Sequence, residues 1–293
     1  MDAFFAQPPQ WKQSHRMPPE VNRGYTPPYG ESLALTLGLE STASVKDYFE
    51  AFNVGVPAEG HPGLDLPRDV YAENPWPAAH AAFDGQGFRK AVEAYFAAAG
   101  SVARTLCRIF ADALGVEPAL FASVTDHSAD VLRMINYALT PGSIIGGVDP
   151  MGMGAHTDYG ILTVLWADRV PGLQVLGPDR LWHDVLPAEG ALLVNLGDLT
   201  ARWTNDRWLS TLHRVRPPVV SGVIQRRRSA AYFHDGNIDA VISTIPTCIG
   251  STRRQYPPIR IGEHLALKLA SSRAGKANSI TGPEAERARA AKA

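Results

Sequence analysis

The sequence predicts a mainly β protein, a sandwich or jelly roll, supported by one long helix. From residue 131 to about residue 244, short apolar runs alternate with turn sequences. The run from Val131 to Tyr137 reads as a strand, and Pro171-Gly172, Gly177-Pro178-Asp179 and 188–190 supply turns between later runs. Many short strands separated by turns are typical of sandwiches and jelly rolls.

The long helix is predicted between Gly87 and Leu114. Apolar side chains recur there at spacings of three and four residues, and Gly115 follows as a stop signal. We expect the apolar face of this helix to pack against the sheet. A short helical turn is expected at 118–122, and a final helix at 264–271 on the outside of the sheet.

Composition divides the chain into three parts. Residues 1–125 are expected to form an N-terminal cap and the supporting helix, and the first 67 of them are rich in Pro, Gly and polar residues. Residues 126–271 hold the predicted jelly-roll core. Residues 272–293 are rich in Ala, Arg, Lys and Glu, with almost no large apolar residue. We expect this polar tail to be a solvated helix or a frayed end.

Charge and cysteine content narrow the class of partner. The 293 residues carry a formal net charge of -1, without the basic excess that nucleic acid or an anionic membrane surface requires. No apolar run has the length needed to span a bilayer. Cys107 and Cys248 are the two cysteines, too few for a disulfide framework or a zinc cluster. We therefore expect a cytoplasmic protein that acts on a small molecule, while its oligomeric state has no signal in the sequence.

A candidate metal site lies in the strand-like segment from Met153 to Thr163. Residues i and i+2 of an extended chain point to the same side, so His156 and Asp158 can bind one ion together. His213, which also follows a strand-like run, is the predicted third ligand. Two imidazoles and one carboxylate with the remaining positions open are the ligand set of non-haem Fe(II) in oxygen chemistry. We expect the neighbouring Thr157 and Tyr159 to point away from the metal.

A candidate carboxylate site follows in the sequence Arg226-Arg227-Arg228-Ser229. Alternation along a strand places Arg227, Ser229 and Phe233 on one face, whereas Arg226 and Arg228 face outward. A guanidinium meets the two oxygens of a carboxylate in bidentate fashion, and a hydroxyl adds a further donor. This pair predicts a co-substrate with a distal carboxylate.

Taken together, the separated motifs resemble the isopenicillin N synthase-like group of 2-oxoglutarate- and Fe(II)-dependent oxygenases. The resemblance runs from about Phe4 to about Ser271, and the His-x-Asp, distal His and Arg-x-Ser motifs of the family fall on the residues named above. It implies a double-stranded β-helix, which is a distorted jelly roll, with a partial N-terminal α/β cap. The family normally begins with a strand, a helix and a second strand before the segment at Phe4, so the cap is expected to lack its first elements.

The resemblance also implies the chemistry. Fe(II), 2-oxoglutarate as co-substrate and dioxygen would together oxidise a small organic molecule, with hydroxylation as the default outcome and secondary metabolism as the setting. Succinate and CO2 would be released. Asn136 and Tyr137 stand where the family has a Tyr-Pro pair, and with Phe233 they are expected to line the substrate or co-substrate pocket. Asn195 and Asp198 are expected to position neighbouring strands, and Trp203 and Trp208 to pack near His213.

Several alternatives remain open on the sequence. An oxidase or cyclase of the isopenicillin N synthase type would keep the same ligands without using 2-oxoglutarate, and a jelly-roll binding protein would bind a ligand without turnover. A metal hydrolase is disfavoured because no Glu lies near His156 or His213 to act as a base. His183 and His234 are the rival candidates for the third ligand, although a structural role fits both better. Desaturation, ring closure and ethylene formation are not separated from hydroxylation by any motif.

Overall fold

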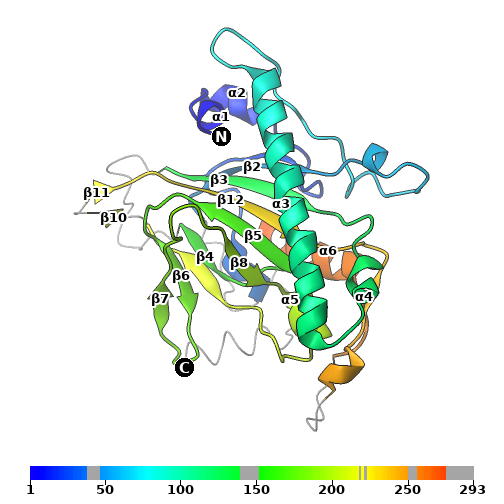
Figure 1. The fold of residues 1–293 in the computed structure, drawn as a ribbon. Helices are drawn as coiled ribbons and strands as arrows, with labels where there is room; N and C mark the ends of the chain where they lie inside the picture. Colours follow the sequence, from blue (N-terminus) through cyan, green and yellow to red (C-terminus); the bar gives the residue numbers. More distant parts are fainter. Residues whose placement is uncertain (38–46, 139–151, 218, 221–222, 250–255, 275–293) are drawn as a thin grey trace.

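Two antiparallel sheets dominate the fold (Figure 1). The computed structural model describes residues 1–37, 47–138, 152–217, 219–220, 223–249 and 256–274. The larger sheet has six strands, and each strand is antiparallel to its neighbours. In spatial order they are β1 (Gly24–Thr26), β2 (Glu50–Gly55), β3 (Val131–Tyr137), β12 (Arg227–His234), β5 (Leu162–Ala167) and β8 (Leu193–Leu196).

The smaller sheet has four strands, and the chain passes back and forth between the two sheets. Its order is β4 (Met153–His156), β9 (His213–Val215), β6 (Leu173–Leu176) and β7 (Trp182–Asp184). Because β5, β8 and β12 of the larger sheet alternate along the chain with β6, β7 and β9 of the smaller one, neighbouring segments face each other across the interior. Two further two-stranded antiparallel sheets pair β10 (Val219–Val220) with β11 (Val223–Ile224) and β13 (Val241–Ile242) with β14 (Ile259–Arg260).

The predicted long helix is α3 (Gly85–Leu114), which crosses one face of the larger sheet (Figure 1). Asp84 caps its first turn by accepting a hydrogen bond from the Gly87 backbone N–H, and Gly115 ends it in the left-handed conformation at φ 66°. Its buried side chains repeat at helical spacing, as expected for packing on a sheet. The helix approaches β12 closely at Gly100, where an added Cβ would lie 2.7 Å from the Tyr232 hydroxyl. Two of the apolar residues on the predicted face, Val102 and Ile109, are exposed instead.

The N-terminal segment is integrated into the core. Phe4 is 1% exposed, and its ring lies 4.5 Å from that of Phe52 and 5.6 Å from that of Phe88. Strands β1 and β2 extend the larger sheet beyond β3, so this part of the chain continues the same sheet. The division of the chain at residue 125 stays a prediction.

The final helix corrects two expectations. Helix α6 (Ile261–Ala274) starts earlier and ends later than predicted, and it lines an internal pocket instead of covering the outside of the sheet. Ser272 and Arg273 were assigned to the polar tail from composition, but both belong to this helix, where Ser272 is buried and Arg273 is half-buried and paired with Glu31. The rest of the predicted tail, 275–293, lies outside the described residues.

The remaining helices are short. Among the described residues, no helix combines the length and the apolar character needed to cross a membrane. The short helices are α1 (Asp2–Phe5), α2 (Pro9–Gln13), α4 (Ala119–Ala122) and α5 (Asp198–Trp203), with 3-10 turns at Leu33–Leu37, Ala58–Gly60 and Pro246–Cys248.

Candidate metal centre and its pocket

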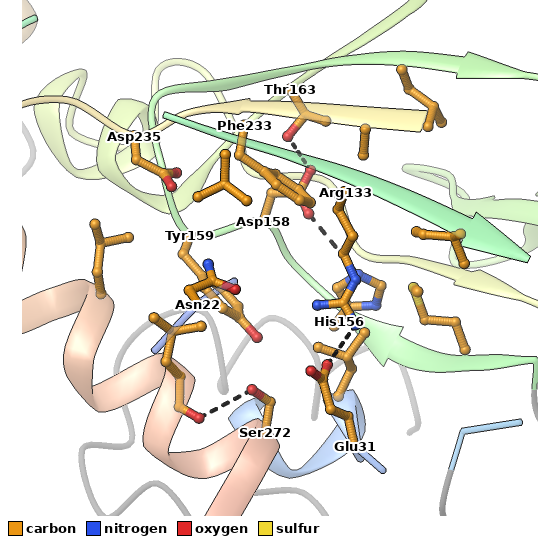
Figure 2. A pocket seen from close by; sticks show the side chains of 18 of the residues that line it. Asn22, Glu31, Arg133, His156, Asp158, Tyr159, Thr163, Phe233, Asp235 and Ser272 are labelled. Carbon is orange, nitrogen blue, oxygen red and sulfur yellow. Dashed lines mark hydrogen bonds and ion pairs between the residues drawn. The ribbon is translucent and has the colours of Figure 1, made fainter. Parts of the chain in front are cut away.

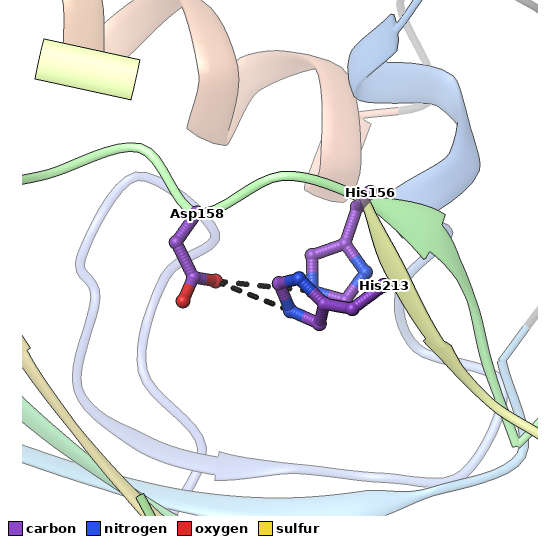
Figure 3. A group of neighbouring side chains, drawn as sticks. All are labelled: His156, Asp158 and His213. Atoms are coloured by element: carbon purple, nitrogen blue, oxygen red, sulfur yellow. Dashed lines mark ion pairs between the residues drawn. The ribbon is translucent and has the colours of Figure 1, made fainter. Parts of the chain in front are cut away.

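Three candidate ligands meet where β4 ends and β9 begins (Figure 3). His156 and His213 are directly paired across these two antiparallel strands, and Asp158 follows two residues after His156. Oδ1 of Asp158 lies 4.0 Å from Nε2 of His156 and 3.6 Å from Nε2 of His213. Within the described parts of the chain, no other group of three His, Cys, Asp or Glu side chains has its ligand atoms within 4.8 Å of one another.

Hydrogen bonds orient each ligand atom toward a common point. Nδ1 of His156 lies 2.8 Å from the Gly154 carbonyl, and Nδ1 of His213 lies 3.0 Å from the Thr211 carbonyl. A carbonyl can only accept, so both Nδ1 atoms carry the proton and both Nε2 atoms present a lone pair. Burial, together with the neighbouring His213, lowers the pKa of His156 to about 3, which keeps the imidazole neutral. This donor set fits a divalent metal ion such as Fe(II).

The second oxygen of Asp158 is held by other side chains. The Asn195 amide donates to Oδ2 at 2.6 Å, and the Thr163 hydroxyl donates to the same oxygen. The backbone N–H of Asp198 donates to the Asp158 carbonyl at 2.8 Å, and the Asp198 carboxylate pairs with Lys268 at 2.8 Å. Asn195 and Asp198 thus support the candidate ligands without being part of the cluster.

The cluster opens into a cavity of about 570 Å³ that is lined by both sheets. Alternate side chains of β3 and β12 point into it, as the pairing of Ile135 with Ser229 and of Tyr137 with Arg227 requires. Strands β4, β6 and β9 supply the opposite wall, and α6 and the segment before β1 supply the outer part. From β3 and β12 the lining residues are Val131, Arg133, Ile135, Tyr137, Arg227, Ser229, Ala231 and Phe233.

Arg227 is a buried cation in this cavity. It is 2% exposed, and the described residues offer it no ion pair and leave its Nε without a hydrogen-bond partner. Its guanidinium carbon lies 5.1 Å from the centroid of the Tyr137 ring, a favourable cation–π position. Ser229, two residues further along the same face, is also 2% exposed. An uncompensated buried guanidinium is costly, so the site calls for an anionic ligand with carboxylate geometry.

Asn136 is not where the sequence analysis placed it. Because it alternates with Tyr137 along β3, its side chain lies on the opposite face of the sheet. There its amide donates to Glu50 at 2.8 Å and its carbonyl oxygen accepts from Arg226 at 2.6 Å. Tyr159 is a second correction: it was expected to point away from the metal, but it lines the cavity (Figure 2).

The other predicted side chains occupy ordinary structural positions. His183 is exposed and bonded to Asp179, and the buried His234 pairs with Asp130 at 3.0 Å, so the structural reading of both histidines holds. Arg228 faces outward and pairs with Asp168 and Asp2.

The two tryptophans expected near His213 pack against helices, and their closeness to His213 stays a prediction. The Trp203 ring lies 4.6 Å from that of Phe121, and the Trp208 ring lies 5.3 Å from that of Phe110.

Two features of the cavity were missed by sequence reasoning. Glu31 is buried and bonds Arg133 at 2.7 Å and Arg273 at 3.2 Å, which joins three distant segments and has no local signal. Asp235 lines the cavity near the end of β12. Asp235 lies two residues after Phe233, so extending the alternation of Arg227 and Phe233 by two residues would have predicted it.

Comparison with known proteins settles the family. The model of the 2OG-Fe(II) oxygenase superfamily matches residues 129–236. The 2-oxoglutarate-Fe(II) type oxidoreductase hxnY of Emericella nidulans is 31% identical, and the alignment covers 95% of this chain and 84% of that protein. This chain belongs to the 2-oxoglutarate–Fe(II) oxygenase superfamily. Its resemblance to the isopenicillin N synthase-like group is thereby confirmed.

Solved structures agree with this family assignment. A full-length Neurospora crassa protein, solved in complex with alpha-KG (2-oxoglutarate) and thymine, is similar to this oxygenase with a TM-score of 0.77 and 31% identity, covering 92% of this chain and 80% of that one. Validamycin A dioxygenase of Streptomyces hygroscopicus subsp. limoneus is 31% identical over 91% of this chain and 70% of that protein. The jelly-roll prediction is confirmed. The oxygenase is a 2-oxoglutarate-dependent oxidoreductase that requires Fe(II), 2-oxoglutarate and dioxygen.

Proposed function

We propose that this oxygenase hydroxylates a small organic molecule of secondary metabolism, with His156, Asp158 and His213 as its iron ligands. Arg227 and Ser229 bind the distal carboxylate of 2-oxoglutarate. One observation carries this assignment: the buried guanidinium of Arg227, which has no ion pair among the described residues, lies in the same cavity as the three-residue ligand cluster. A metal-binding protein that did not use a carboxylate co-substrate would have no use for that buried charge.

Each of these side chains has a distinct task. The two imidazoles and Oδ1 of Asp158 hold the metal on one face of the cavity, because their other polar atoms are already bonded elsewhere. The guanidinium of Arg227, resting on Tyr137, receives the carboxylate farthest from the metal. When bound, Fe(II) with 2-oxoglutarate and dioxygen supplies the oxidant, and succinate and CO2 leave as the co-substrate is consumed. Apolar side chains from both sheets exclude water from this region.

The substrate class rests on relatives and on the shape of the cavity. The names of validamycin A dioxygenase and of the thymine complex of the Neurospora crassa protein point to small organic molecules as the ligands of these two relatives. The outer part of the cavity, beyond His156 and toward α6, leaves room for such a molecule. A cytoplasmic location is part of the proposal, supported by two buried cysteines that are both unpaired.

An anaerobic titration tests the residue roles. We expect Fe(II) and 2-oxoglutarate together to give the weak visible charge-transfer band of the chelate with the wild-type protein. His156→Ala should abolish the band, and Arg227→Ala should require a much higher 2-oxoglutarate concentration. Arg228→Ala is the matched control, because that neighbouring arginine faces outward and binds Asp168 and Asp2.

Two outcomes would contradict the proposal. A wild-type protein that binds Fe(II) without showing the band on addition of 2-oxoglutarate would lose its assigned co-substrate site. Equal effects of Arg227→Ala and Arg228→Ala would remove the specific role of Arg227. With both results as expected, succinate release in the presence of candidate substrates identifies the molecule that is hydroxylated.

A further inference from the structure

A second unpaired charged group lies in the cavity, apart from Arg227. Asp235 is 9% exposed, and within the described residues its carboxyl group has neither a hydrogen bond nor an ion pair. Its side chain points into the same space as Tyr159 and Phe233 (Figure 2). A carboxyl group in such a position is expensive to bury unless a ligand satisfies it.

The position of Asp235 is built into the fold. The residue follows the last residue of β12, on the face that carries Ser229, Ala231 and Phe233. An added Cβ on Gly160 would lie 2.1 Å from Oδ1 of Asp235, so the carboxyl group packs directly against that glycine. Its own backbone N–H donates to Asp130 at 3.2 Å, which ties the chain at this point.

Of the three arginines other than Arg227 that line the cavity, two are already paired with a carboxylate. Arg133 and Arg273 both bind the buried carboxylate of Glu31, at 2.7 and 3.2 Å. Arg23 donates to three backbone carbonyls, those of Asn22, Val56 and Val70. Arg133 and Arg273 are therefore matched by Glu31, whereas Arg23 forms no hydrogen bond with Asp235 and acts on it only through its charge, which lowers the pKa of Asp235. Two exposed acids, Glu20 and Asp69, also line the mouth of the cavity and add negative potential.

Asp235 has apolar side chains of the cavity near it as well as the ion pair of Asp130 with His234. Val131 and Phe233 come from the larger sheet, and Ile238 and Leu265 close the same region. Burial, followed by the charge of Asp130, raises the pKa of Asp235 to about 8. A hydrogen-bond donor from a ligand would oppose this effect of burial, because it favours the ionised carboxylate.

We propose that Asp235 is a substrate-recognition residue, and that the substrate presents a nitrogen-bound hydrogen to it from an apolar skeleton. The nitrogen is either a protonated amine or the N–H of a neutral ring, since both donate to a carboxylate. The inference rests on the proposed function, because it places the substrate in the cavity that holds the metal and 2-oxoglutarate. Asp235 acts in binding and does not take part in the oxidation itself.

Matched probe pairs test this assignment on the protein loaded anaerobically with Fe(II) and 2-oxoglutarate. Benzylamine and benzyl alcohol differ in the cationic nitrogen, and 2-pyridone and N-methyl-2-pyridone differ in a neutral N–H. Their affinities are measured by calorimetric titration for wild type, Asp235→Asn and Asp235→Ala. Asp69→Asn is the control, because it makes the same chemical change on an exposed acid at the cavity mouth.

We expect the wild type to prefer the N–H-bearing member of at least one pair. Asp235→Asn and Asp235→Ala should lower the affinity for that member by about ten-fold or more, as loss of a charge-assisted hydrogen bond predicts. The affinity for the other member of the pair should stay unchanged. Asp69→Asn should retain the preference. If the Asp235 variants lose affinity for benzylamine alone, the substrate is assigned a cationic nitrogen. If they lose affinity for 2-pyridone, it is assigned a neutral N–H.

Other results would overturn the inference. Wild-type protein that binds both members of each pair equally, or not at all, gives Asp235 no recognition role. The same holds if the Asp235 variants keep the wild-type preference. Because 2-oxoglutarate binding is monitored in the same samples, its loss in the wild type would instead count against the proposed function on which the inference rests.

Discussion

The side-chain amide of Asn195 lies 2.6 Å from Oδ2 of Asp158, and this contact leaves the other carboxylate oxygen to face the two imidazoles. Asn195→Ala should therefore weaken Fe(II) binding by about 10- to 100-fold, the usual cost of losing a group that orients a metal ligand. Anaerobic competition with a chelator measures this affinity. Gln174→Ala is the control, since its amide group binds Asp184 and Arg214 and not a candidate ligand. Equal Fe(II) affinities in both variants would contradict the role given to Asn195.

The aromatic ring of Tyr137 contributes to co-substrate binding through its contact with Arg227. Tyr137→Leu removes the ring, and we expect the dissociation constant for 2-oxoglutarate to rise by about 3- to 30-fold, as loss of a buried cation–π contact predicts. Tyr137→Phe keeps the ring and should bind 2-oxoglutarate nearly as the wild type does. The charge-transfer band measures both. If Tyr137→Phe and Tyr137→Leu weaken 2-oxoglutarate binding equally, the hydroxyl group and not the ring contributes to that binding.

Local sequence patterns predicted the parts of this structure that depend on neighbours along the chain. The strand Val131–Tyr137 was predicted to the residue, because its apolar run has clear limits. Alternation along β12 correctly placed Arg227 and Ser229 on one face. The helix ending at Leu114 was equally clear, since helical spacing and a terminal glycine both mark it.

Contacts between distant segments could not be predicted in this way. Glu31 meets Arg133 and Arg273 only because β3, α6 and the segment after β1 come together in the folded chain. Helix α6 has no marked apolar face in its sequence, so its position along the cavity came from tertiary packing alone. The inward direction of Tyr159 was missed because the chain leaves the strand after His156, where strict alternation no longer applies.

The buried carboxylate of Glu31 should be important for stability. Burial by itself would raise the pKa of Glu31, but Arg133 and Arg273 outweigh that effect and hold it below the usual value. Glu31→Gln leaves two buried guanidinium groups without their anion, and we expect a loss of about 3–5 kcal/mol in the free energy of unfolding. Urea denaturation at neutral pH measures it.

Two further measurements test that account of Glu31. Glu59→Gln, in an exposed pair with Arg68, should leave the free energy of unfolding essentially unchanged. Because the folded-state pKa of Glu31 is depressed, its contribution is present at neutral pH and is lost as the pH falls through that value. The difference in the free energy of unfolding between wild type and Glu31→Gln should therefore become smaller in acid. A difference that does not depend on pH would contradict the ion-pair explanation.

His234 should make stability fall as the solution becomes alkaline. Burial alone would lower its pKa, but the Asp130 carboxylate 3.0 Å away raises the pKa of His234 to about 10. An unfolded histidine has a pKa of about 6.5, so above that pH folding takes up a proton. The contribution of His234 is complete below about pH 6.5 and declines as the pH rises toward 10, by up to about 1.4 kcal/mol per pH unit.

The slope of stability against pH isolates this effect of His234. His234→Gln should lower stability near neutral pH, because Asp130 loses its buried partner. Between pH 7 and 9, roughly the window between the two states' pKa values, the variant should lose less stability than the wild type does. Urea denaturation at several pH values measures both curves. His183→Gln, on the exposed histidine that binds Asp179, should keep the wild-type slope. Parallel curves for wild type and His234→Gln would mean that His234 is neutral in the folded protein.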